Sequence, residues 1–419
     1  MTEDTKHSAG LAQPAYRHRR APAEHGHHRV AFLELFFDLV FVFAITQLSH
    51  GLIHHPTPGG FFQTILLAMA VWWVWIYTSW STNWADPDKP LVRLMMIGLM
   101  LLGLFLSMAI PAAFEQRAMV FALTYVAMQV LRSAFMVRVM REYDEASAGT
   151  MRRILLWFVA SGVLWIGGAA MGGSWQIGLW LLAVLLEYSG PALRFPTPVL
   201  GRSDIDTWRI EPAHFAERCG LFIIIALGES VLVSGATFAK LDWSTPTTMA
   251  FIVSFGGTVA MWAIYFNIGQ ERGVIAMRQA SQSGAVARAY TYVHLVIILG
   301  IIVTAVSDEF VLSHASGTLD TKTLVTVLGG PILYLPGCSL FKRATAGWFP
   351  LSHTVGIGVL AGLWFAGSML QPWQMGLAVC LVLVAVAVWE RISLGPDAVH
   401  AIGHPSQRRT TPQNGNQPG

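Results

Sequence analysis

The chain has 419 residues, of which 54% are hydrophobic and only 12% are charged, and its net charge is +3. Soluble domains carry about 25% charged residues, so this composition excludes an ordinary soluble protein. The mean hydropathy of +0.52 and the 16 Trp indicate a chain embedded in lipid. Because the net positive charge is small and spread between apolar runs, we expect no nucleic-acid partner.

The N-terminal 29 residues are polar and lack the apolar stretch of a cleavable signal, so the first membrane span is predicted to act as signal anchor. We interpret residues 1–29 as a disordered cytoplasmic tail whose arginines favour anionic headgroups. This tail contains His7, His18, His25, His27 and His28. A metal site there is an alternative, but a solvated tail is the simpler interpretation, and we expect neither a metal nor a cofactor.

Twelve apolar runs follow, separated by Pro, Gly or charged residues. Each is about 20 residues long, enough to cross a bilayer as a helix. We therefore predict an all-α polytopic membrane protein with about twelve transmembrane helices, over residues 31–53, 61–82, 91–111, 116–138, 153–172, 175–193, 214–236, 247–268, 287–307, 322–341, 348–369 and 372–391. The division between the fifth and sixth runs, at "GGSWQ", is the least sharply marked.

Charge asymmetry predicts the orientation. With a cytoplasmic N-terminus, only Arg117, Lys240 and Lys322 of the 27 Lys and Arg residues fall on the outer side. Loops on the cytoplasmic side of membrane proteins are rich in Lys and Arg, so we predict a plasma-membrane protein with both termini in the cytoplasm. The membrane domain is expected to span 30–394, followed by a disordered tail over 395–419.

The runs hint at an internal duplication. "DLVFVFAITQ" (38–47) aligns with "GLFIIIALGE" (220–229), and each segment opens a group of six runs. Six is an even number, so two such halves, 30–195 and 212–394, would form a parallel repeat. Chance similarity between apolar helices is the alternative.

Two acids interrupt the first run, "VAFLELFFDLVFVFAITQLSH". Glu34 and Asp38 are four residues apart and share one face of a helix. An ionised carboxylate at the depth of Asp38 costs several kcal/mol in lipid, so it must be protonated, paired or in contact with water. Either it pairs with an Arg as interhelical glue, or it handles ions or protons. Glu34 is close enough to the predicted interface to reach it.

A second polar group opens the seventh run, "HFAERCGLFIIIALGES". His214, Glu217 and Arg218 have the spacing of one helical face. One alternative is that Glu217 and Arg218 form an interfacial charged pair. Glu229 lies three helical turns further along and needs a partner inside the membrane.

The candidates for that partner are Arg132, in the fourth run, and His294, in the ninth. For His294 itself a hydrogen-bonded structural role is the preferred interpretation, and titration near neutral pH is the alternative. Glu187 and Asp308 are expected near the cytoplasmic and outer interfaces.

The remaining chemistry is sparse. Cys219, Cys338 and Cys380 lie in apolar segments without metal-type spacing and are expected to be free core residues. The sequence contains no P-loop, GxGxxG, HExxH or GxSxG motif in a suitable context. We therefore do not expect an enzyme.

The two polar segments resemble the signature blocks of the bacterial low temperature requirement protein A family of multi-pass inner-membrane proteins. The resemblance extends over about residues 28–392 and implies an inner-membrane location. That family is named for growth in the cold and has no established molecular activity. The residues that match its blocks are Glu34, Phe37, Asp38, His214, Glu217, Arg218, Gly228 and Glu229.

Three functions stay open at this level. The first is a secondary transporter or ion-handling permease in which Asp38 and Glu229 line a polar cavity. The second is a cation channel, because "FFDLVFVFAIT" is similar to the first-helix motif of a potassium-channel family, although Phe replaces Ser and the second half lacks the acid. The third is a non-transporting scaffold or cold-tolerance factor. The expected partners are the bilayer and a small ion or solute, and the sequence leaves a homo-oligomer open.

Overall fold

A computed structural model describes residues 30–142, 144–204, 211–267 and 283–403. These ranges contain twelve α-helices and no β-strand beyond an isolated bridge, so the all-α prediction is confirmed. Eleven of the helices are long and apolar enough to cross a membrane, and a shorter apolar segment, Leu351–Ala366, accompanies them.

The first six helices correspond to the first six apolar runs. They are α1 (Phe32–His54), α2 (Pro58–Trp84), α3 (Pro90–Ala109) with the short 3-10 helix η1 (Ile110–Ala112), α4 (Ala118–Arg141), α5 (Glu145–Met171) and α6 (Gly173–Leu193). The uncertain division at "GGSWQ" is a sharp turn, because Gly172 and Gly173 have φ of 67° and 53°, a left-handed conformation that glycine adopts without strain.

The remaining runs form the other six helices. They are α7 (Pro212–Phe238), α8 (Thr245–Phe266), α10 (Ser283–Ser313), α11 (Thr321–Ala346), α12 (Leu351–Leu363) with the 3-10 helix η3 (Trp364–Ala366), and α13 (Pro372–Gly403). α13 continues past residue 394, where the membrane domain was predicted to end. The predicted tail 1–29, with its histidines, and residues 404–419 lie outside the described residues.

Local sequence signals set several helix starts. The side chains of Thr57, Asp144, Ser244 and Asp320 each accept a hydrogen bond from a backbone N–H in the first turn of α2, α5, α8 and α11. These caps satisfy donors that the helix itself leaves unpaired. Proline at the first helical position also favours helix initiation in α2, α3 and α7.

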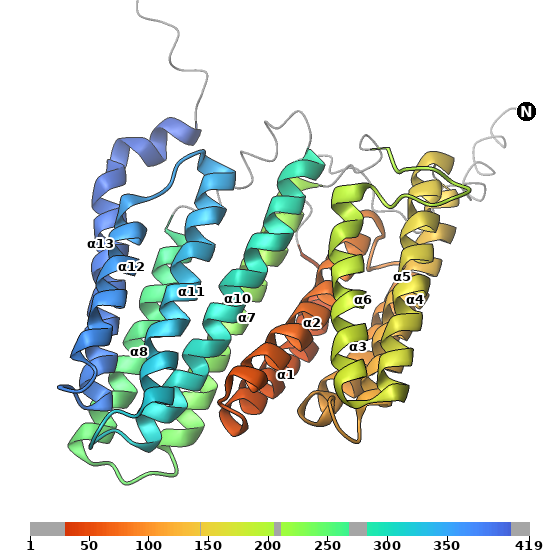
Figure 1. Cartoon of the computed structure of the whole chain (residues 1–419). Coiled ribbons are helices and arrows are strands. Elements are labelled where there is room, and N and C mark those ends of the chain that lie inside the picture. Colours follow the sequence, from red (N-terminus) through yellow and green to blue (C-terminus); the bar gives the residue numbers. More distant parts are fainter. Residues whose placement is uncertain (1–29, 143, 205–210, 268–282, 404–419) are drawn as a thin grey trace, which may run out of the picture.

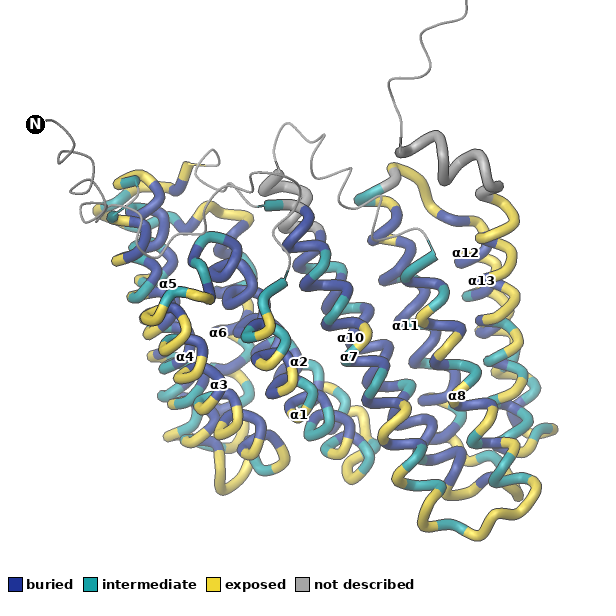
Figure 2. Tube along the Cα trace, turned by 180° about the vertical axis from the view of Figure 1, so that it is seen from behind, coloured by how far each residue is buried: buried dark blue, intermediate teal, exposed yellow. Residues whose placement is uncertain are grey.

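The helices run up and down through one bundle that is more than one helix deep, since α10 lies in front of α7 and packs against it (Figure 1). α1 and α2 lie between a group formed by α3–α6 and a group formed by the later helices, because α1 packs on α3 and also on α7 and α10. We call the side on which α1 and α7 begin the terminal face, and the other side the distal face. Buried residues line the helix contacts, and exposed residues occupy the periphery (Figure 2). The exposed residues include Leu94, Leu101, Val163, Leu232 and Leu381, as lipid contact requires.

The order of helix contacts is similar in the two halves. α1 packs on α2 and α3, α3 on α4, and α5 on α4 and α6; likewise α7 packs on α8 and α10, α10 on α11, and α12 on α11 and α13. This order is what a parallel six-helix repeat requires. The repeat itself stays a prediction.

α10 and α11 approach each other most closely. A Cβ atom built on Gly300 would lie 2.7 Å from the backbone nitrogen of Tyr334, and one on Gly330 would lie 2.4 Å from the Oγ1 atom of Thr304. Only glycine permits backbones to come this close, a common device of membrane helices.

Candidate functional site

The first turns of α1 and α7 join through buried ionic contacts. Glu34 and Asp38, one turn apart on α1, both face α7 as their spacing predicted. The Nη2 atom of Arg218 lies 2.6 Å from Oδ1 of Asp38, and Nη1 lies 3.2 Å from Oε1 of Glu34. The Nε2 atom of His214 lies 3.0 Å from the same Glu34 oxygen. We call these four side chains the α1–α7 network.

α2 supplies the supporting contacts. Trp75 donates a hydrogen bond of 2.8 Å from its indole nitrogen to Oδ1 of Asp38, and its ring lies 5.5 Å from the guanidinium carbon of Arg218. The Nδ2 atom of Asn83 lies 3.2 Å from Nδ1 of His214. Asn83 in turn bonds the backbone of Glu211, just before α7 begins. The network therefore ties three helices together.

All four side chains of the network are 0% exposed. Even so, Oδ2 of Asp38 and Nε of Arg218 have no hydrogen-bond partner among the described residues, and Nη1 of Arg218 contacts Glu34 as an ion pair without forming a hydrogen bond. A buried polar atom without a partner costs about 1–3 kcal/mol, and such groups commonly mark a functional site or a site for water or an ion. The charged groups of the α1–α7 network are thus ion-paired, but some of its hydrogen-bonding atoms have no partner among the described residues.

Glu229 lies deeper in the bundle and has a different partner from Asp38. The hydroxyl of Thr46, on α1, donates a hydrogen bond of 2.5 Å to Oε2 of Glu229. Glu229 is 1% exposed and its Oε1 atom has no partner among the described residues. Thr46 is eight residues beyond Asp38, about 12 Å along the helix at 1.5 Å per residue. The two acids therefore lie at different depths.

Neither residue predicted to pair with Glu229 does so. Arg132 donates a hydrogen bond of 2.5 Å to Gln129 and lies over the rings of Tyr77 and Phe158. His294 hydrogen-bonds the hydroxyl of Tyr265 and the carbonyl of Tyr290, each at 2.8 Å. His294 is therefore hydrogen-bonded inside the bundle, as the preferred interpretation expected.

Two further expectations were wrong. Glu217 forms no ion pair with Arg218, whose ionic partners among the described residues are Glu34 and Asp38. Adjacent helical residues point about 100° apart, so Glu217 is partly exposed while Arg218 is buried. Glu34 does not reach an interface but is completely buried.

Sequence reasoning also missed buried polar groups elsewhere. Glu187 is 3% exposed and accepts hydrogen bonds from Tyr125, Ser161 and Trp165, so it is not interfacial. Asp308 is likewise buried and bonds Ser230. In the second half, both carboxylate oxygens of Glu390 lie 2.6 Å from Nζ of Lys342. The basic end of the tenth apolar run, at Lys342 and Arg343, was the only signal for that pair.

Cys219 and Cys338 are free and buried, as predicted, whereas Cys380 is free but only partly buried. Among the described residues, no group of three or more His, Cys, Asp or Glu side chains is placed to hold a metal ion. The carboxylates and the imidazole of the α1–α7 network are groups that can accept a proton.

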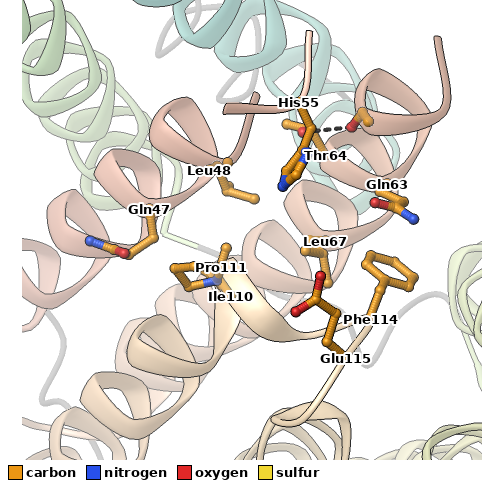
Figure 3. Close-up of a pocket in the computed structure, with 12 residues that line it drawn as sticks. Gln47, Leu48, His55, Gln63, Thr64, Leu67, Ile110, Pro111, Phe114 and Glu115 are labelled. Carbon is orange, nitrogen blue, oxygen red and sulfur yellow. Dashed lines mark hydrogen bonds between the residues drawn. The ribbon is translucent and has the colours of Figure 1, made fainter. Parts of the chain in front are cut away.

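A cavity of about 260 Å³, lined by both polar and apolar residues, lies toward the distal face. The end of α1, the start of α2 and the segment around η1 form its walls (Figure 3). Its innermost α1 residues, Gln47 and Leu48, directly follow Thr46 in the sequence. The cavity and the α1–α7 network therefore occupy opposite ends of α1.

These features define a multi-pass helical membrane protein with a buried ionic network between its helices. Residues 29–388 match the family described as bacterial low temperature requirement A protein (LtrA), and the chain belongs to that family. It is 39% identical over 369 residues to an uncharacterized protein of Rhizobium meliloti (strain 1021), with 87% of this chain and 90% of the relative covered. No solved structure matches the chain.

Proposed function

We propose that this protein is an ion-handling permease in which the α1–α7 network closes the terminal face. The observation that carries the proposal is the complete burial of two carboxylates, a guanidinium and an imidazole whose hydrogen bonds are only partly satisfied. Ionisable groups inside a membrane protein commonly belong to ion or proton pathways. We further propose that the terminal face is cytoplasmic, as the Lys and Arg distribution predicts.

The charge of the network depends on His214. Two carboxylates and one guanidinium carry one net negative charge, and protonation of the imidazole brings the sum of the four side chains to zero. Gaining or losing that proton changes the attraction between α1 and α7. A proton or cation can therefore bias the equilibrium between closed and open arrangements, because it binds the two arrangements unequally.

Flux through purified protein in proteoliposomes tests the proposal. A pH-sensitive dye inside the vesicles reports proton movement, and an imposed sodium or potassium gradient reports cation movement. We expect saturable flux for the wild type and loss of its pH dependence in Asp38→Asn and His214→Gln. The control is Asp88→Asn, whose side chain is 81% exposed and which leaves the network intact.

A non-transporting membrane protein is the second candidate. It is favoured by the pairing of both α1 acids with Arg218, since interhelical ion pairs also serve as structural glue. Under this alternative, Asp38→Asn lowers stability, and no saturable proton or cation flux is seen with the wild type. Absence of flux from correctly folded wild-type protein would overturn the permease proposal.

A further inference from the structure

Asp308, on α10, is a buried carboxylate without a basic partner. Its side chain is 7% exposed, and no Lys, Arg or His of the described residues forms an ion pair with it. The buried acids Asp38 and Glu390, in contrast, each contact a cation, Arg218 and Lys342. An ionised carboxylate inside a membrane protein needs a counter-charge. When Asp308 is ionised, the protein itself therefore does not supply one.

Hydroxyl groups from two neighbouring helices surround this carboxylate. Ser230, on α7, donates a hydrogen bond to Oδ2 of Asp308, and the side chain of Ser254, on α8, also hydrogen-bonds Asp308. The Oγ1 atom of Thr258 lies 3.1 Å from Oγ of Ser230 and 3.1 Å from the carbonyl oxygen of Ser254. Oxygen atoms from α7, α8 and α10 thus gather at Asp308, and oxygen is the ligand atom that hard cations prefer.

The carboxylate also borders a small cavity of about 40 Å³, which Ser254, Thr304 and Ser307 line as well. Thr304 lies one helical turn before Ser307 and Asp308, so these three residues share one face of α10. Ser307 is 6% exposed, yet its hydroxyl makes no hydrogen bond with any described residue. A buried hydroxyl without a partner commonly marks a place for water or an ion.

α11 adds a backbone oxygen to the same cavity. Pro331 lies inside α11 and has no N–H, so it cannot donate the helical hydrogen bond to the carbonyl of Val327. Both residues line the cavity. A Cβ atom built on Gly330 would lie 2.8 Å from the backbone nitrogen of Thr304, so this part of α11 lies directly against α10. In membrane transporters, carbonyls freed from helical hydrogen bonds coordinate sodium ions.

Size and charge restrict what the cavity can hold. Asp308 is the only charged residue among those that line it, so one monovalent cation neutralises the site. A water molecule needs about 10–15 Å³, and a volume of about 40 Å³ therefore accommodates an ion with at most a few waters. Pockets for organic ligands are about 300–1,000 Å³, which excludes such a ligand here.

We infer that Asp308 binds a sodium ion in this cavity, with the hydroxyls of Ser254 and Ser307 as further ligands. The carbonyl of Val327 supplies another oxygen. α10 ends at the distal face (Figure 1), and Asp308 lies five residues before its last residue, Ser313, or about 7.5 Å at 1.5 Å per residue. The ion therefore enters from the distal face. This inference goes beyond the permease proposal, because equilibrium binding of an ion requires no transport.

Thermal unfolding of the full chain in detergent micelles tests the inference. Sodium chloride replaces choline chloride at constant ionic strength, and tryptophan fluorescence reports the midpoint of unfolding. A ligand that binds only the native state raises this midpoint as its concentration passes the Kd. We expect the midpoint to rise with sodium chloride, and to rise less with potassium chloride because potassium is the larger ion.

Two variants test the ligands. Asp308→Asn keeps an oxygen that can accept the hydrogen bond from Ser230 but removes the charge, so it should abolish the sodium-dependent rise. Ser307→Ala removes one hydroxyl that has no partner among the described residues, so it should fold normally and bind sodium about three- to tenfold more weakly. The matched control is Asp242→Asn, a change in an exposed acid of the α7–α8 loop, which should respond as the wild type does.

Several results would overturn the inference. They are no sodium-dependent rise in the wild type, an equal rise with potassium, or a wild-type response in either Asp308→Asn or Ser307→Ala. Asp38→Asn should keep the rise, because no residue of α1 lines the cavity, and loss of the rise in this variant would also overturn the inference. Absence of flux from wild-type protein that shows the rise would overturn the permease proposal alone, so the two failures are distinguishable.

Discussion

Removing the guanidinium of Arg218 should destabilise the protein more than any comparable change at its surface. Arg218→Met preserves most of the apolar stem but leaves Glu34 and Asp38, both fully buried, without the cation that lies 3.2 Å and 2.6 Å from them. Breaking a buried ion pair on one side costs about 3–5 kcal/mol. Loss of the contact with the ring of Trp75 adds about 1 kcal/mol.

The free energy of unfolding in mixed detergent micelles, followed by circular dichroism, measures this effect. Adding Asp38→Asn to Arg218→Met should recover about 1–3 kcal/mol, because one of the two stranded charges is removed and residues in one network are energetically coupled. The matched control is Arg138→Met. Its side chain is 72% exposed and lies 3.4 Å from Glu142, so it should cost at most about 1 kcal/mol. Equal losses for the Arg218 and Arg138 variants would refute this reasoning.

Three other changes follow from the same structure and the same unfolding measurement. Trp75→Phe should cost about 1.5–3 kcal/mol, because a hydrogen bond to a charged group is lost, and should cost much less once Asp38 is already Asn. Lys342→Met should lower the free energy of unfolding by about 3–5 kcal/mol, because it leaves the Glu390 carboxylate buried without its cation. The double variant Lys342→Met and Glu390→Met should be close to neutral, and a double variant as unstable as the single one would contradict this. Gly300→Ala should cost about 1–3 kcal/mol by overpacking against Tyr334, while Gly257→Ala, with nothing within 4 Å, should stay within about 0.5 kcal/mol; similar melting of both would contradict the packing argument.

The architecture follows from the sequence because membrane helices obey local rules. Hydrocarbon requires an unbroken apolar run of about 20 residues for each span. Each predicted run has its helix, but α12, with 13 residues, is shorter than the other eleven, which are long enough to cross a membrane. The glycines at 172 and 173 mark the turn between α5 and α6 that the hydropathy pattern alone left uncertain. Helix spans and turns of this kind are determined by residues close together in the chain, so they can be predicted from a single sequence.

The partners inside the bundle could not be predicted in the same way. The spacing of Glu34 and Asp38 correctly placed both acids on one face, but it could not show that Arg218 faces them. Adjacency in the sequence favoured a Glu217–Arg218 pair, which helical geometry forbids. The contact of Thr46 with Glu229 joins residues 183 positions apart, and no local periodicity encodes such a contact.

The position of Glu187 illustrates a second limit. It lies close to the end of its apolar run, which suggested an interfacial side chain. The position of a residue along its helix does not show which side chains surround it. Because α6 packs against α5, hydrogen-bond donors from α4 and α5 enclose the Glu187 carboxylate. Burial in a bundle is set by neighbouring helices as well as by distance from the helix end.

The glycine contacts between α10 and α11 limit how this molecule can rearrange. Two helices whose backbones touch at Gly300 and Gly330 have no side chains between them over which they could slide, so they must travel as one stiff body. Any hinge or rocking motion between helices is then left to boundaries other than the one between α10 and α11.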